Sequence, residues 1–244
     1  MSVLVLERRA SAVIARLNRP HVRNAIDQET VDALHELCAE LEQRPQTLII
    51  TGSDGVFASG ADIGQLRERR AADALKGINA TVFVRINELP MPVIAAIDGY
   101  ALGGGAELAY AADIRIGTPE LKIGNPETGL GIIASAGASW RLKELVGEPL
   151  AIELLLTGRV MRAEEALAVR LVSALHPAET LLDAAIAIAE RIARNDPAAT
   201  RYTKRVFHAP RAEHPRVDSE AQAVLFESPE KLRRMTEFLE RKTR

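Results

Sequence analysis

The chain has 244 residues, of which 47% are apolar and 26% are charged, and its formal net charge is -2. This profile is typical of a globular protein with a sizeable core, and it favours neither a nucleic-acid partner nor a membrane surface. Cys38 is the single cysteine, which excludes an intrachain disulfide and is typical of a reducing compartment. The N-terminus lacks a signal-peptide pattern, and no uncharged apolar run reaches the ~18 residues of a membrane span, so we expect a cytoplasmic protein.

Strand and helix patterns alternate through the first half of the chain. Strands are predicted at 3–7, 12–17, 47–51, 92–97, 113–116 and 121–123. Asp27 is expected to cap a helix over 28–43, and an amphipathic helix is expected at 76–89. The charged segment 66–75 between these elements is expected to be irregular. Helices between strands indicate right-handed crossovers, so we predict an α/β fold.

The C-terminal third differs in composition. Gly158 is the last glycine, and the residues after it read almost entirely as helix. Helices are predicted at 148–156, 163–168, 178–193, 197–207, 219–226 and 229–242. One strand is expected in this part, at 171–175. We therefore divide the chain into an α/β core, residues 1–195, and a C-terminal helical region, residues 196–244.

Two loops of small residues each follow a strand and lead into a helix. They read Ala58-Ser59-Gly60-Ala61-Asp62 and Leu102-Gly103-Gly104-Gly105-Ala106-Glu107. Helix starts offer free N–H groups, and such loops at one edge of a sheet could stabilise a developing oxyanion. The alternative is that both are tight turns that serve packing alone. Neither loop fits a dinucleotide or nucleoside-triphosphate motif.

Two carboxylates accompany these loops. Glu107 lies at the helix start of the second loop, and Glu127 follows Asn125-Pro126 in a third loop. The pair could share acid–base work if burial raises a pKa toward neutrality, or both could simply be acids that a helix dipole favours. The five histidines are scattered and Cys38 falls on an apolar helix face, so we expect neither a metal site nor a thiol nucleophile.

Four stretches together resemble the enoyl-CoA hydratase/isomerase (crotonase) family. They read F-A-S-G-A-D-I (57–63), P-V-I-A-A-I-D-G-Y-A-L-G-G-G-A-E-L (92–108), A-A-D-I-R-I (111–116) and N-P-E-T-G-L-G (125–131). The similarity covers nearly the whole chain. It implies a crotonase-like spiral of ββα turns, followed by a helical trimerisation region. It also implies self-association as a trimer or a dimer of trimers.

The resemblance implies an acyl-CoA thioester substrate and no separate cofactor, because coenzyme A is part of that substrate. The backbone N–H groups of Ala61 and Gly104 match the family's oxyanion hole. Glu107 and Glu127 match the two acid–base residues of the hydratases, with Glu107 expected to act on water and Glu127 on the α-carbon. Residues expected to contact the substrate are Arg23, Ala58, Ser59, Ala61, Asp62, Ile63, Gly64, Gly104 and Ser135.

Some positions depart from the hydratase pattern. Ser135 stands where a glycine usually lets a backbone N–H reach the catalytic water, Asn125 stands where glutamine is frequent, and Trp140 lies in the same altered stretch. Hydration of a 2-enoyl-CoA is the favoured activity. The alternatives are another reaction of the family (isomerase, hydrolase or ring-modifying enzyme) and an acyl-CoA-binding protein without turnover. No nucleic-acid or membrane partner is expected.

Overall fold

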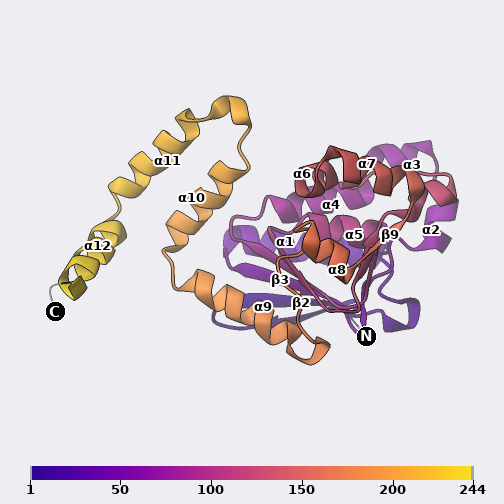
Figure 1. Cartoon of the computed structure of the whole chain (residues 1–244), viewed down its shortest axis with the longest axis horizontal. Coiled ribbons are helices and arrows are strands. Elements are labelled where there is room, and N and C mark those ends of the chain that lie inside the picture. The colour runs from indigo at the N-terminus through magenta and orange to yellow at the C-terminus, as the bar shows by residue number, and fades with distance from the viewer. Residues whose placement is uncertain (1, 243–244) are drawn as a thin grey trace. The chain divides into compact units, whose positions relative to one another are not determined.

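A computed structural model describes residues 2–242 of the chain (Figure 1). The chain divides into two compact units, Met1–Ala189 and Glu190–Arg244, which are described separately here. No helix among the described residues is long and apolar enough to cross a membrane.

Two sheets run through the first unit. The larger sheet has the strand order β1 (Leu4–Arg8), β2 (Ala12–Leu17), β3 (Thr47–Thr51), β5 (Val93–Ile97) and β7 (Ile114–Gly117). The smaller sheet has the order β4 (Val56–Ala58), β6 (Tyr100–Leu102), β8 (Lys122–Gly124) and β9 (Val160–Arg162). The pairs β1–β2 and β8–β9 are antiparallel, and all other neighbouring pairs are parallel.

The chain alternates between the two sheets in a regular way. It passes from β3 to β4, then from β5 to β6, and then from β7 to β8, and each passage moves one strand along both sheets. Helical segments follow each pair of strands. This arrangement is a spiral of ββα turns, and it confirms the predicted fold class. The central strands β3 and β5 are buried at every residue, as expected for parallel strands covered on both faces.

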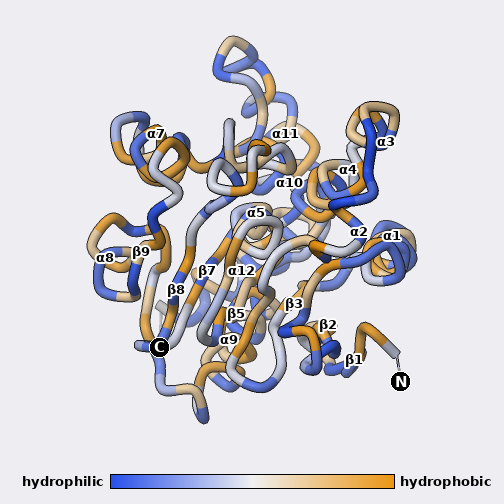
Figure 2. Tube along the Cα trace, turned by 90° about the vertical axis from the view of Figure 1, so that its right-hand side faces the viewer, coloured by the Kyte–Doolittle hydropathy of each residue, from blue (hydrophilic) through white to orange (hydrophobic). Residues whose placement is uncertain are grey.

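Helices and short helical turns fill the rest of the first unit. They are η1 (Pro20–Val22), α1 (Gln28–Gln43), α2 (Ile63–Glu68), α3 (Ala71–Lys76), α4 (Ile78–Asn87), α5 (Gly104–Tyr110), η2 (Pro126–Leu130), η3 (Ala138–Leu142), α6 (Lys143–Val146), α7 (Glu148–Thr157), α8 (Ala163–Ala168) and most of α9 (Ala178–Ala193). The Asp27 side chain accepts the Thr30 N–H at 2.9 Å, so the predicted cap of α1 is confirmed. Helices such as α7 and α8 alternate hydrophobic and hydrophilic segments in Figure 2, as expected for helices that pack one face on a core.

Three local predictions were wrong. The segment 66–75 is not irregular, because α2 and α3 occupy most of it; the side chains of Asp62 and Asp73 accept the backbone N–H groups of Gln65 and Arg70 there. The residues 171–175 form no strand, and only Leu175 makes an isolated bridge, with Gly117. A strand forms instead at β9, which is stabilised by antiparallel pairing with β8. Its three residues are too few to show an alternating pattern of apolar and polar residues.

The second unit is helical. It contains the end of α9, then α10 (Pro197–Phe207), the short turn η4 (Arg211–Glu213), α11 (Arg216–Phe226) and α12 (Pro229–Lys242). Many large apolar side chains of this unit are exposed, including Phe207, Phe226, Leu232, Phe238 and Leu239. The described part of the unit buries few residues of its own, with Ala221 as a buried apolar example.

Candidate active site

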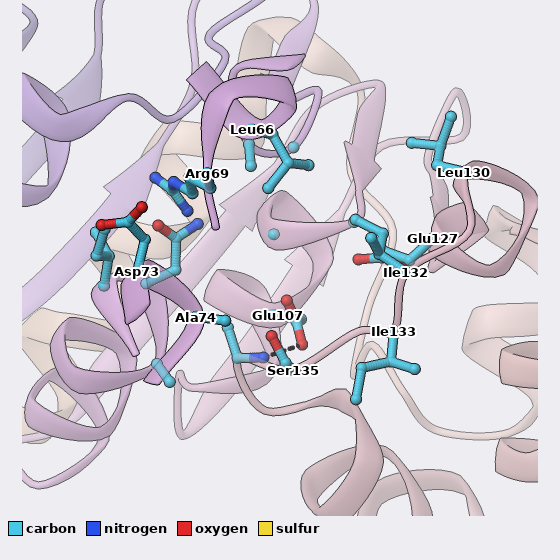
Figure 3. Close-up of a pocket in the computed structure, with 18 of the residues that line it drawn as sticks. Leu66, Arg69, Asp73, Ala74, Glu107, Glu127, Leu130, Ile132, Ile133 and Ser135 are labelled. Carbon is cyan, nitrogen blue, oxygen red and sulfur yellow. Dashed lines mark hydrogen bonds between the residues drawn. The ribbon is translucent and has the colours of Figure 1, made fainter. Parts of the chain in front are cut away.

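A cavity of about 630 Å³ opens in the first unit, where the two small-residue loops meet. Its lining comes from the loop before α2, from the segment that joins α2 to α4, from the N-terminus of α5, and from the chain around and after η2. Glu107 and Glu127 both line it. Figure 3 shows Glu107 in the middle of the cavity, beside Ser135.

Backbone hydrogen bonds fix the first loop to Ile26, and the glycines of the second loop pack closely against it. The Ile26 N–H donates to the Gly60 carbonyl at 2.8 Å, and the Asp62 N–H donates to the Ile26 carbonyl at 3.0 Å. A Cβ atom at Gly105 would lie 2.3 Å from the Ala58 carbonyl oxygen, so only glycine permits this approach of the loops. The glycine run therefore brings the start of α5 directly against the loop that contains Ala61.

Two backbone N–H groups remain free at this junction. Within the described residues, neither the Ala61 N–H nor the Gly104 N–H donates to a backbone acceptor. The two residues adjoin, because a Cβ atom on Gly104 would lie 3.5 Å from the Ala61 nitrogen. Gly104 is also the first residue of α5, where the helix dipole adds positive potential. The two N–H groups can donate hydrogen bonds to an oxygen that gains negative charge.

Glu107 is a buried carboxyl with a perturbed pKa. Its side chain lies in the first turn of α5, and the residue is 3% exposed. Its Oε1 accepts backbone N–H groups from Ala136 at 2.7 Å and from Ala138 at 3.1 Å. Burial raises the pKa of Glu107 to about 7; the Ala138 N–H opposes the rise and the nearby charge of Glu127 adds to it. Glu107 can therefore exchange a proton near neutral pH.

Glu127 is the second buried carboxyl. It is 8% exposed and lies in η2, and its Oε1 accepts a hydrogen bond from the Asn125 Nδ2 at 3.4 Å. Its Oε2 is buried and has no hydrogen-bond partner among the described residues. Burial raises the pKa of Glu127, and the Asn125 amide opposes that rise. A buried carboxyl oxygen without a partner is suited to a ligand atom or to a reacting proton.

The residues that the sequence pointed to are distributed unevenly. Those that line the cavity are Ser59, Ala61, Ile63, Gly104, Glu107, Glu127 and Ser135. The others, Arg23, Ala58, Asp62 and Gly64, lie outside its lining. Ala58 is fully buried behind Gly105, and the Asp62 side chain accepts the Gln65 N–H at the start of α2. Arg23 is exposed, but its carbonyl accepts the Ser59 N–H at 3.1 Å, which places it beside the loop.

Sequence reasoning did not single out two polar residues of the cavity. Asn79 is 9% exposed in the first turn of α4, and Arg69 is half-buried between α2 and α3. In the sequence, Arg69 lies in the charged segment expected to be irregular and Asn79 lies in the helix predicted at 76–89, and both read as ordinary polar positions. No spacing in the sequence signals that the fold turns them toward the carboxylates.

Comparisons with known proteins agree with this architecture. The sequence profile described as enoyl-CoA hydratase/isomerase matches residues 7–244. The short-chain-enoyl-CoA hydratase of Clostridium acetobutylicum is 34% identical over 98% of this chain and 95% of its own. The 2,3-dehydroadipyl-CoA hydratase of Escherichia coli is 34% identical over 85% of this chain and 82% of its own.

Solved structures are similar over the same extent. The crystal structure of enoyl-CoA hydratase from Bacillus anthracis superposes with a TM-score of 0.93 and 30% identity, covering 98% of this chain and 96% of that one. The structure of DspI from Pseudomonas aeruginosa superposes with a TM-score of 0.93 and 29% identity, covering 99% and 95%. The chain therefore belongs to the enoyl-CoA hydratase/isomerase family and is an enoyl-CoA hydratase-like lyase.

Proposed function

We propose that the protein adds water across the double bond of a 2-enoyl-CoA thioester to give a 3-hydroxyacyl-CoA. The observation that carries this proposal is the pair of buried carboxyls, Glu107 and Glu127, that line one cavity beside two free backbone N–H groups. The names of the relatives, which are hydratases of enoyl-CoA thioesters, support the same reaction.

In the proposed mechanism, the N–H groups of Ala61 and Gly104 bind the thioester oxygen. Water attacks the β-carbon, the electrons of the double bond move toward the thioester, and the oxygen gains enolate charge. Donors placed for that charge stabilise the transition state more than the ground state, which is the requirement for catalysis.

The two carboxyls then share the proton transfers. We assign Glu107 to the attacking water and Glu127 to the α-carbon. Glu107 takes a proton from the water as its oxygen bonds to the β-carbon, and Glu127 supplies a proton to the α-carbon. Support for two different roles comes from their surroundings, because backbone donors orient Glu107 whereas Glu127 has a free Oε2. The addition changes no overall oxidation state, so the proposed reaction needs no redox cofactor.

The altered stretch around Ser135 is compatible with this proposal. The hydrogen bonds to Glu107 come from the backbone of Ala136 and Ala138, and a serine in place of glycine at 135 leaves both N–H groups intact. Ser135 itself lines the cavity and adds a hydroxyl to it.

The decisive experiment follows crotonyl-CoA by absorbance and mass spectrometry. Hydration predicts that the conjugated absorbance disappears and that the product gains the mass of one water. An unchanged product mass would indicate isomerisation, release of free coenzyme A would indicate hydrolysis, and binding without any product would indicate an acyl-CoA-binding protein.

We also propose that the second unit joins subunits into a trimer or a dimer of trimers. Support comes from its exposed apolar side chains, of which Phe207 is 80% exposed and Leu239 is 65% exposed. Large exposed apolar residues gathered on a few helices are typical of protein interfaces. Light scattering coupled to size-exclusion chromatography tests the proposal, and a monomer at micromolar concentration would contradict it.

A further inference from the structure

Two hydrogen-bond donors on one wall of the cavity lack an acceptor. Asn79, in α4, lines the cavity, and its Nδ2 lies 3.3 Å from the position of a Cβ atom on Gly104. Within the described residues the Asn79 Nδ2 donates no hydrogen bond, and its buried Oδ1 accepts none. An amide kept at 9% exposure without a partner is costly, unless a ligand completes its hydrogen bonds.

Arg69 is the second donor. It lies between α2 and α3, is half-buried, and lines the same cavity. Within residues 2–242 its guanidinium makes no hydrogen bond or ion pair. Its neighbour Arg70 differs, because the Arg70 Nη1 donates to the backbone carbonyls of Arg67 and Arg69 at 3.3 Å.

The charge of this wall is positive. Asp73 is the acidic residue of the wall, but it forms an ion pair with Lys76 at 2.9 Å and accepts the Arg70 N–H at 3.1 Å. Those bonds lower the pKa of Asp73, with the Lys76 interaction as the main cause. The Asp73 carboxylate also interacts electrostatically with Arg69, but no ion pair or hydrogen bond joins the two side chains, so the Arg69 guanidinium lacks a hydrogen-bonded acceptor among the described residues.

The two sides of the cavity differ in polarity. Figure 3 shows Arg69 and Asp73 on one side and Leu130, Ile132 and Ile133 on the other, with Glu107 between them. A purely hydrocarbon acyl chain would satisfy the apolar side. On the polar side it would remove water from Arg69 and Asn79 and offer them no acceptor.

We infer that the acyl group of the substrate ends in a carboxylate, which Arg69 binds while the Asn79 amide donates to an oxygen of the same acyl group. This inference rests on the proposed hydration of an acyl-CoA and names its substrate class, the 2-enedioyl-CoA thioesters. A carboxylate is the acceptor that matches a guanidinium with two parallel hydrogen bonds. The phosphates of coenzyme A offer related chemistry, and the experiment separates the two sources.

The test compares 2-hexenoyl-CoA with 2-hexenedioyl-CoA, which differ only at the end of the acyl chain. We expect kcat/KM to be roughly tenfold higher for 2-hexenedioyl-CoA, because the terminal methyl group of 2-hexenoyl-CoA leaves Arg69 and Asn79 without an acceptor. In Arg69→Met this ratio should fall toward one, and Arg69→Lys should keep part of it. Asn79→Leu should shift the ratio toward the hydrocarbon substrate. Arg67→Met is the matched control, since Arg67 is exposed, pairs with Glu68 and does not line the cavity.

Two results would overturn the inference. One is a wild-type enzyme that prefers 2-hexenoyl-CoA or does not distinguish the two. The other is an Arg69→Met variant that weakens both substrates equally, which would assign Arg69 to the phosphates of coenzyme A. Calorimetry with the saturated hexanoyl-CoA and hexanedioyl-CoA keeps the inference separate from the proposed function. If no thioester turns over but the dioyl thioester binds more tightly through Arg69, hydration fails and the inference stands.

Discussion

The Oε1 atom of Glu107 accepts the backbone N–H of Ala136 at 2.7 Å, across 29 residues of sequence. The Ala138 N–H donates to the same oxygen at 3.1 Å. The main chain after η2 thus orients a carboxyl that α5 carries, and it leaves the side chains of that stretch free to shape the cavity.

Removing either carboxyl should abolish hydration while the fold is kept. Glu107→Gln retains an oxygen for the Ala136 and Ala138 N–H groups but cannot take a proton from the attacking water. Glu127→Gln cannot supply a proton to the α-carbon. We expect each variant to lose at least about a hundredfold in kcat with crotonyl-CoA. Glu120→Gln, at an exposed position, is the control. Full activity in both active-site variants would contradict the assigned roles.

Stability should depend on pH through Glu107. Its pKa is about 7 in the fold against 4.5 for an unperturbed glutamate, so between these values the folded state binds more protons than the unfolded state. The stability that this protonation contributes is complete below about pH 4.5 and is lost as the pH rises through about 7. A pKa shift of this size corresponds to a change of about 3 kcal/mol in the free energy of unfolding.

The measurement is urea unfolding of the wild type and Glu107→Gln between about pH 4.5 and about pH 8. The variant should gain stability relative to the wild type as the pH rises, because glutamine never ionises. If the difference between the two proteins stays constant across this range, Glu107 does not have a raised pKa.

A methyl group at Gly105 should separate the two loops of the site. A Cβ there would lie 2.3 Å from the Ala58 carbonyl oxygen and 2.8 Å from the Ala58 Cβ, and both atoms belong to buried structure. We expect Gly105→Ala to cost about 2–4 kcal/mol of stability and to reduce kcat/KM for crotonyl-CoA. Gly129→Ala is the matched control, since a Cβ there meets nothing within 4 Å. Equal behaviour of the two variants would mean that the loops are not held this closely.

The cap of α1 should contribute strongly to stability, although Asp27 does not line the cavity. Asp27 accepts the Thr30 N–H at 2.9 Å and the Thr30 hydroxyl at 2.8 Å, and it pairs with the Arg19 guanidinium at 2.9 Å. We expect Asp27→Ala to lower the free energy of unfolding by about 2–4 kcal/mol, because α1 loses its N-cap and the mostly buried Arg19 loses its closer ion-pair partner, with Asp62 remaining at 3.9 Å. Asp32→Ala, on the exposed face of the same helix, should change it by less than about 0.5 kcal/mol. Thermal unfolding of both variants checks the difference.

Local patterns in the sequence predicted most of the fold. Asp27 before an amphipathic run predicted the start of α1, and the buried apolar run at 93–97 predicted β5, because both signals lie within one element. The strand at β9 could not be predicted, since its three residues are stabilised by pairing with β8, far away in the sequence. The short helices α2 and α3 were missed because each spans only six residues, and the capping contacts of Asp62 and Asp73 are visible only in the structure.

The candidate site was predictable to a different degree. Glu107 and Glu127 stood out because each follows a loop of small residues, and their catalytic roles stay predictions. Arg69 and Asn79 could not be found, because only the tertiary fold brings the segment after α2 and the first turn of α4 to the same cavity as the N-terminus of α5. The role of Arg23 in binding coenzyme A also stays a prediction.

The hydrogen bonds to Glu107 have a consequence for engineering. A donor that belongs to the main chain survives every substitution except proline, which is the one residue without an N–H group. A library could therefore vary the side chains at positions 135 and 136, which line the cavity, with proline excluded at 136. Each member that keeps the backbone path of this stretch would retain the orientation of the carboxyl, so changes in substrate range could be selected separately from changes in proton transfer.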